Sequence, residues 1–363
     1  MEHDKYNTFP FVYFCDSRYA LMMTATFSRA QLVDMAEKNL RDIVTLAIEK
    51  KPGEKALVVY DTQYGLTGIL VEAYRRVLPD AKFVDFDKSP KEDIIALFDE
   101  MRERDLVVLI QSSNFLLDAF RIRLHLFQKK LKVIEHVHLH RNSEPVWDVY
   151  INALAYDPGW YRVVGPKLRA KLENCQELRI EGGGAVLTIT GGLEPPKPNL
   201  GDYTGMENIG GTFPIGEVFT ESRDFSKMNG SFMIYAYAGG DFCVNMHEPF
   251  RVDVTNGIVT GFAEDAPKSF VDIVETIKQY ERPLIREIGF GLNRAITKDR
   301  YLEDITAFER ILGMHLSLGE KHSVYKKSDI TTHKTKFHVD LFPYVDKVLA
   351  DGEVIFENGK YLV

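Results

Sequence analysis

The sequence predicts an α/β protein with an N-terminal doubly wound parallel-sheet domain and a C-terminal strand-rich α+β domain. Between about residues 25 and 140, short apolar runs alternate with amphipathic helical segments, which is the pattern of parallel βαβ units. Beyond about residue 175, strand patterns separated by glycines replace this alternation. Because 363 residues exceed what one hydrophobic core usually holds, we expect two domains, residues 1–175 and 176–363.

The N-terminal elements follow from the hydrophobic pattern. Apolar residues spaced by three to four positions predict helices, whereas short and almost wholly apolar runs are typical of strands buried on both faces. The predicted elements are, in order, helix 30–50, strand 56–60, helix 67–77, strand 82–86, helix 90–104 with Ser89 as its N-cap, strand 106–111, helix 115–129 and strand 131–140.

The C-terminal half is expected to begin with a helical connector over 153–177, in which Asp157-Pro158-Gly159 forms a turn. The glycine triplet 182–184 then predicts the turn of a hairpin over 179–190. Further strands are expected at 232–237, 250–254 and 258–262, and helices at 270–280 and 302–312.

Composition and charge exclude several classes of protein. The net charge of −8, without a basic stripe, argues against nucleic-acid and anionic-membrane partners. The apolar runs are too short for a membrane span, and the acidic start lacks the features of a signal peptide. Cys15, Cys175 and Cys243 form no C-x-x-C pair, so neither a disulfide framework nor a thiolate site is indicated. We therefore expect a cytoplasmic protein.

Ionisable residues occupy strand-like positions in the C-terminal half. Such side chains are costly to bury unless they are paired or bind a metal, so a shared metal centre is the simplest explanation. The candidate metal ligands are Glu217, Glu287, His315, His338 and Asp340. The competing interpretation of each histidine is a buried imidazole held by a main-chain carbonyl.

The segment around His338 shows the expected geometry most directly. His338 and Asp340 alternate with Phe337, Val339 and Leu341, so on a strand the polar pair shares one face and the apolar residues share the other. Two ligands at such positions can reach a common ion. The C-terminal domain is therefore predicted to bind metal.

The charge of the candidate ligands favours two metal ions. Their carboxylates contribute about −3, which two divalent ions and a bridging hydroxide nearly neutralise. Oxygen and nitrogen donors without thiolates suit Zn, Co, Mn or Fe(II). Such a pair of ions can activate a shared water and polarise a carbonyl, which suits hydrolysis of an amide, with a glutamate as general base.

The C-terminal half resembles the thermophilic-type metallo-aminopeptidases, the family of aminopeptidases T and S. The residues that carry the resemblance are GGTFPIGEVFT at 210–220, Glu287 with Gly291 and Asn293, HLSLG at 315–319, and His338-Val339-Asp340. The resemblance implies two divalent ions (Zn, Co or Mn), a small peptide or amide substrate, and a homodimer. The implied metal ligands are Glu217, Glu287, His315, His338 and Asp340, with Glu287 doubling as the catalytic base.

Two departures from the family pattern add further candidates. The stretch before His315 is one residue shorter than in the family, which makes Glu309 a possible additional metal ligand. A family tyrosine that helps to stabilise the tetrahedral intermediate is replaced by His322, with Tyr325 close behind it. We therefore count His322 and Tyr325 as candidate catalytic residues.

Two other functions remain open. The 2,5-dihydroxypyridine 5,6-dioxygenases look like relatives of the same fold, and His315, His338 and Asp340 would form their Fe(II) triad. A catalytically silent binding or scaffold protein is the other alternative. Metal content separates the three possibilities. The hydrolase should bind about two equivalents of metal, the dioxygenase about one of iron, and the silent protein none.

A separate group of histidines lies at the predicted end of a parallel strand. His136, His138 and His140 alternate over 131–140, and the carboxyl ends of parallel strands line the ligand crevice of such sheets. His138 and His140 are therefore candidate substrate-binding residues, with a polar strand end at the surface as the competing interpretation. The site is expected in the cleft between the two domains.

Overall fold

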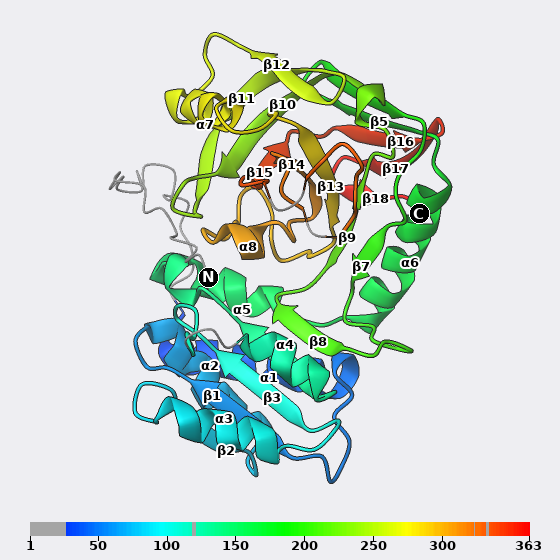
Figure 1. Cartoon of the computed structure of the whole chain (residues 1–363). Helices are drawn as coiled ribbons and strands as arrows, with labels where there is room; N and C mark the ends of the chain where they lie inside the picture. The colour runs from blue at the N-terminus through cyan, green and yellow to red at the C-terminus, as the bar shows by residue number, and fades with distance from the viewer. Residues whose placement is uncertain (1–26, 118–120, 323, 332–333) are drawn as a thin grey trace.

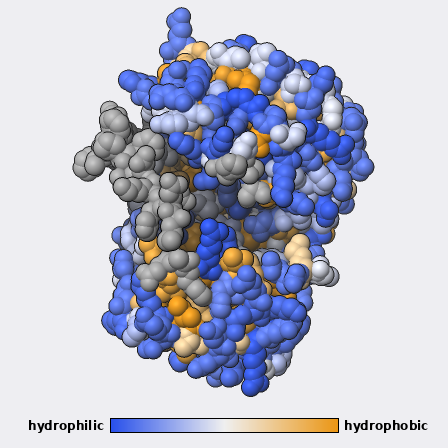
Figure 2. Space-filling view, in the orientation of Figure 1, coloured by the Kyte–Doolittle hydropathy of each residue, from blue (hydrophilic) through white to orange (hydrophobic). Residues whose placement is uncertain are grey.

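The chain forms a mixed α/β structure with two sheets. The computed structural model describes residues 27–117, 121–322, 324–331 and 334–363, so Cys15 and the acidic N-terminal segment lie outside it. A 5-stranded sheet forms one lobe and a 13-stranded, curled sheet forms the other (Figure 1). Mostly hydrophilic residues cover the face of the molecule drawn in Figure 2. Within the described ranges, the helices are too short or too polar to cross a bilayer.

The smaller sheet is parallel throughout. Its strands in spatial order are β2 (Lys82–Asp85), β1 (Ala56–Tyr60), β3 (Leu106–Ile110), β4 (Lys132–His136) and β8 (Ile209–Phe213). β8 comes from the second half of the chain and pairs with β4, for example Val133 with Gly210. A Cβ on Gly210 would lie 1.8 Å from the Val133 carbonyl oxygen, so glycine is required there.

Helices cover both faces of this sheet. Val58 packs in the core that includes α1 and α2, whereas its neighbour Leu57 packs in the core that includes α3 and α4. This burial on both faces explains the continuous apolar runs of β1 and β3. The helices are α1 (Arg29–Asp42, extended by a π turn over Ile43–Ala47), α2 (Gly65–Val77), α3 (Lys91–Glu100) and α4 (Ile122–Gln128).

Several predicted boundaries are wrong. Ser89 does not cap α3, whose N-cap is Pro90 without a side-chain bond. β4 ends at His136, and His138 adopts a left-handed conformation with φ 54° before a 3-10 turn over Leu139–Arg141. The histidines at 136, 138 and 140 therefore do not alternate along one strand. α4 is also shorter than predicted, and residues 118–120 lie outside the description.

The predicted helical connector over 153–177 contains one helix, α6 (Pro158–Asn174), and a further helix, α5 (Trp147–Ala153), lies directly before it. Asp157 is the N-cap of α6 and accepts a hydrogen bond from the Trp160 amide, so Asp157-Pro158-Gly159 begins a helix rather than forming a free turn. The predicted helix over 302–312 is also wrong, because α8 spans only Ile305–Phe308.

The larger sheet is antiparallel throughout. β11 and β12 extend it from β10, and α7 (Lys268–Lys278) packs its apolar face on the same core. The strands in spatial order are β18 (Lys360–Tyr361), β17 (Glu353–Glu357), β16 (Lys347–Ala350), β5 (Glu177–Gly182), β6 (Ala185–Thr190), β10 (Met228–Ala238), β15 (Val339–Pro343), β14 (Gly313–Leu318), β13 (Ile285–Gly291), β9 (Glu217–Glu221) and β7 (Lys197–Asn199). β11 (Val244–Thr255) also pairs with β10, and β12 (Ile258–Phe262) pairs with β11.

Candidate metal centre

Four adjacent strands, β9, β13, β14 and β15, bring the predicted ligands to one face of the larger sheet. Across this face Glu217 pairs with Gly291, and His315 pairs with Gly289. A Cβ on Gly289 would lie 2.0 Å from the His315 ring, so the glycine leaves the space that the imidazole occupies. Asp340 follows on β15, opposite Ser317 of β14. The alternation of side chains along each strand thus produces the cluster.

A first group of possible metal ligands is Glu217, Glu287 and His315. The Nε2 atom of His315 lies 3.1 Å from Oε1 of Glu287 and 3.3 Å from Oε1 of Glu217. Each residue offers one possible ligand atom, and these three atoms all lie within 4.8 Å of one another. All three side chains are buried, so water screens their charges weakly.

A second group shares His315 with the first and adds Glu309 and Asp340. His338 lies beside it, just before β15 begins, with Nε2 3.1 Å from Oδ1 of Asp340 and Nδ1 3.0 Å from the main-chain oxygen of Lys321. The structure therefore brings Glu217, Glu287, Glu309, His315 and Asp340 into one cluster and places His338 at its edge.

Free donor atoms in the cluster fit a divalent cation. Within the described residues, Oε1 of Glu217, Oδ1 of Asp340 and Nδ1 of His315 are buried without a hydrogen bond. Buried polar atoms normally make hydrogen bonds, whereas these two carboxylate oxygens only lie near a histidine Nε2, at 3.3 Å for Glu217 and 3.1 Å for Asp340. Because a metal ion would satisfy oxygen and nitrogen donors together, the donor set agrees with Zn, Co, Mn or Fe(II).

The shifted pKa values report a strong negative potential. Burial raises the pKa of Glu309 to about 8, with Arg310 opposing the shift and Glu217 adding to it. Burial alone would lower the pKa of His315, but its hydrogen bond to Glu287 and the surrounding carboxylates raise it to about 9. Burial would raise the pKa of Glu287, yet hydrogen bonds from His315 and His322 hold it below its ordinary range. The cluster therefore attracts cations.

Arg310 supplies a positive charge that sequence reasoning missed. Its Nη1 atom lies 2.7 Å from Oε2 of Glu217 and 2.7 Å from Oε1 of Glu309. The single turn of α8 ends just before these residues, and the Asn293 amide binds the Arg310 carbonyl at 3.0 Å. The available signal is the Glu309-Arg310 pair, which lies shortly before the HLSLG motif at 315–319.

His322 connects two carboxylates that face each other across β9 and β13. Glu221 pairs with Glu287 in the register, and His322 hydrogen-bonds Glu221 through Nδ1 while its Nε2 lies 2.8 Å from Oε2 of Glu287. Arg286, fully buried, binds Glu221 at 2.9 Å. Sequence reasoning missed Arg286. Glu221 could have been identified, because residues four positions apart on a strand lie on the same face, and Glu221 is four positions after Glu217.

Tyr325 is placed differently from His322. Its hydroxyl donates a hydrogen bond to the Pro195 carbonyl at 2.8 Å, and its ring centroid lies 5.8 Å from that of His322. In this arrangement His322, and not Tyr325, contacts Glu287. The Tyr325 hydroxyl binds the main chain instead.

The candidate substrate-binding histidines lie at the carboxyl end of β4. His138 has a buried Nδ1 without a hydrogen bond within the described residues, and His140 hydrogen-bonds the Ser112 carbonyl. Arg141 joins this loop to the larger lobe through Asp304, at 3.0 Å. Asp304 is the N-cap of α8, so the loop is linked through one helical turn to Glu309.

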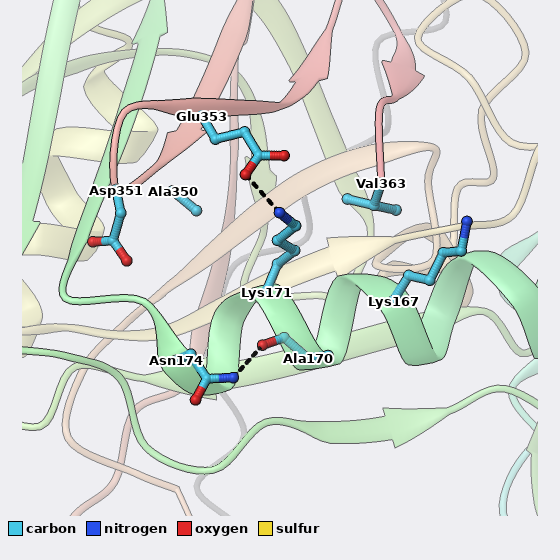
Figure 3. A pocket seen from close by; sticks show the side chains of 8 residues that line it. All are labelled: Lys167, Ala170, Lys171, Asn174, Ala350, Asp351, Glu353 and Val363. Carbon is cyan, nitrogen blue, oxygen red and sulfur yellow. Dashed lines mark hydrogen bonds and ion pairs between the residues drawn. The ribbon is translucent and has the colours of Figure 1, made fainter.

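A separate shallow pocket lies between α6 and the C-terminal strands (Figure 3). Lys171 reaches across it to Glu353 at 2.5 Å. Its lining residues, which include Lys167, Asp351 and Val363, are different from those of the metal cluster.

Comparisons with known proteins agree with this architecture. No protein-family model matches the chain, and no curated protein does so significantly. The solved structure of 2,5-dihydroxypyridine dioxygenase from Pseudomonas putida KT2440 is similar, with a TM-score of 0.62, 16% identity, and coverage of 93% of this chain and 98% of that chain. Wild-type AmpT from Thermus thermophilus is also similar, with a TM-score of 0.57, 12% identity, and coverage of 91% and 99%. The resemblance that the motifs indicate is therefore confirmed for the fold, which this chain shares with the aminopeptidase AmpT and with a 2,5-dihydroxypyridine dioxygenase.

Proposed function

We propose that this protein is a metal-dependent hydrolase of the aminopeptidase type, which removes an N-terminal residue or cleaves a small amide. The observation that carries the proposal is the carboxylate-rich cluster, in which buried donor atoms of Glu217, His315 and Asp340 make no hydrogen bond within the described residues. The proposed ligands are Glu217, Glu287, His315, His338 and Asp340, with Glu309 as a further candidate. The aminopeptidase AmpT, which has the same fold, supports this assignment.

A bound divalent metal would lower the pKa of a water molecule and polarise the scissile carbonyl. The chain's own residues would handle the protons. Glu287 is held as a carboxylate by His315 and His322, so it can accept a proton from the attacking water. The two ring nitrogens of His322 face the carboxylates of Glu221 and Glu287, so the ring can be doubly protonated. Its Nε2 can then give a proton to the leaving amine, and the proton that Glu287 has taken from water replaces it.

The substrate is proposed to lie between the two lobes. His138 and His140 follow β4 at the carboxyl end of the parallel sheet, where such folds bind their ligands. The contact of Arg141 with Asp304 ties their loop to the segment that carries Glu309. A homodimer and a boundary near residue 175 remain predictions that size measurement and limited proteolysis can test.

One observation favours a second candidate. His338 and Asp340 lie together, with Nε2 and Oδ1 3.1 Å apart, and the dioxygenase from Pseudomonas putida has the same fold. With His315 they would bind one Fe(II) as a two-histidine, one-carboxylate triad. Glu217 and Glu287 would then need another role, which makes the hydrolase the preferred proposal.

Activity and metal content together test the proposal. Chelator-treated protein reloaded with Zn, Co or Mn should release arylamine from aminoacyl-arylamides, and Glu287→Gln should abolish this activity. Glu353→Gln, which changes the exposed pair with Lys171, serves as the matched control. Oxygen uptake with Fe(II) and 2,5-dihydroxypyridine, without hydrolysis, would support the dioxygenase instead. A protein that binds no metal would overturn both proposals and leave a binding or scaffold role.

A further inference from the structure

The guanidinium of Arg310 bridges the two groups of possible metal ligands. Nη1 lies 2.7 Å from Glu217, which belongs to the first group, and 2.7 Å from Glu309, which belongs to the second. His315 is common to both groups. A fixed cation thus lies where the two groups meet.

Arg310 is part of the cluster and not a surface residue that bends toward it. It is 8% exposed, and its Nε is buried without a hydrogen bond within the described residues. A buried guanidinium stays charged and is costly to desolvate, so it requires carboxylate partners. Glu217 and Glu309 provide that compensation, which keeps the side chain in place.

A second metal ion would compete with this guanidinium. Oε2 of Glu217 accepts a hydrogen bond from Nη1, and Oε1 of Glu309 forms an ion pair with the same atom, so each carboxylate has one oxygen already paired with a cation. Two positive charges a few ångströms apart in a buried site repel strongly because the surroundings screen them poorly. In the first group, Oε1 of Glu217 stays free and faces His315 at 3.3 Å.

We propose that Arg310 takes the place of one of two cations, so that the centre binds a single divalent ion in the group formed by Glu217, Glu287 and His315. The inference rests on the proposed metal-dependent function and deepens it by assigning the number of ions. It replaces the expectation of a dinuclear centre, because the guanidinium contacts one oxygen of Glu217 and one of Glu309 that a second ion would need.

Metal titration of Arg310 variants tests the inference. Arg310→Met removes the charge and keeps much of the side-chain length, whereas Arg310→Lys keeps the charge and serves as the matched control. Each protein is stripped with chelator, titrated with Mn²⁺, and assayed for bound metal after gel filtration. We expect one equivalent for the wild type and for Arg310→Lys, and two for Arg310→Met.

Electron paramagnetic resonance of the Mn²⁺-loaded wild type gives an independent test that needs no variant to fold. A single isolated ion gives a six-line spectrum, which supports the inference, whereas exchange coupling between two ions overturns it. Two equivalents in the wild type, or one in a folded Arg310→Met, overturns the inference but leaves the metal-dependent function standing. No bound metal in any protein overturns both.

Discussion

Gly289 of β13 lies opposite His315 of β14, and the imidazole fills the space that a side chain at residue 289 would need. The position of a candidate metal ligand thus depends on the absence of a methyl group on the neighbouring strand. This dependence leads to a direct test of the site geometry.

Gly289→Ala should displace the His315 ring, because the new Cβ would lie 2.0 Å from it. We expect metal affinity to fall by about 10-fold to 100-fold, the range seen when a ligand loses its orienting contacts. Isothermal titration with Zn²⁺ measures the change. Gly240→Ala is the matched control, because a Cβ there meets no atom within 4 Å. Unchanged affinity in Gly289→Ala would contradict the ligand role of His315.

His322→Asn and Tyr325→Phe should behave differently. His322 contacts Glu287, so its loss should lower kcat by about 100-fold, as removal of a general acid or base does. Tyr325 binds the Pro195 carbonyl, so its loss should cost about 1 kcal/mol of stability and leave kcat nearly unchanged. Steady-state kinetics and urea unfolding separate the two effects. The reverse ranking would assign the catalytic role to Tyr325.

Metal should stabilise the folded chain. A ligand that binds only the native state at 100 times its Kd adds about 2.7 kcal/mol to the free energy of unfolding. We therefore expect a higher Tm with Zn²⁺ or Mn²⁺ and a lower Tm after chelation, with the increase lost in the double variant Glu217→Gln, Asp340→Asn. An equal shift in that variant would show that the ion binds elsewhere.

Stability should fall as the pH falls because of His136. Burial between Tyr74 and Tyr150 lowers the pKa of this histidine from 6.5 to about 3. Between these pH values the unfolded chain binds a proton that the folded chain does not, so unfolding is favoured as pH decreases. The loss is about 2 kcal/mol between pH 6.5 and 5. Urea unfolding of the wild type, His136→Gln and the exposed control His247→Gln measures it. The fall should be smaller by about this amount in His136→Gln and unchanged in His247→Gln, while His138, whose pKa burial lowers to about 4, contributes in all three proteins.

The buried pair of Arg141 and Asp304 should contribute more to stability than exposed pairs. Their side chains are 16% and 2% exposed, and removal of one partner leaves the other charge buried. Asp304→Ala should therefore cost about 3–5 kcal/mol, whereas Glu353→Ala at the exposed Lys171 pair should cost less than about 1 kcal/mol. Similar costs for both variants would mean that water screens the Arg141 pair.

Local pattern accounts for the central strands and for the polar residues on them. The boundaries of β1 and β12 agree with prediction, because short apolar or alternating runs between turn residues indicate strands directly. The alternation around His338 and Asp340 also predicted that these two side chains lie on the same side, and their Nε2 and Oδ1 atoms are 3.1 Å apart. Glu217 and His315 come from other strands. The register between strands brings these residues together, and it depends on contacts far apart in the sequence.

The wrong helix at 302–312 and the unpredicted position of Arg310 both depend on contacts between residues far apart in the sequence. The apolar spacing over 302–312 suggested a long helix, but the carbonyl of Arg310 binds the amide of Asn293, and β14 begins at Gly313. Tertiary pairing therefore overrode helix propensity. The same turn brings Arg310 between Glu217 and Glu309, which residue spacing alone does not reveal.

The parallel sheet is completed by β8, so its outer strand is synthesised long after the other four. A fragment that stops near residue 175 would leave one side of β4 with free amide and carbonyl groups, a template for association with other chains. Truncation there should yield aggregates, whereas a fragment extended past Phe213 would include β8, which pairs with the exposed edge of β4. The boundary suggested by composition is thus a poor place to cut this polypeptide.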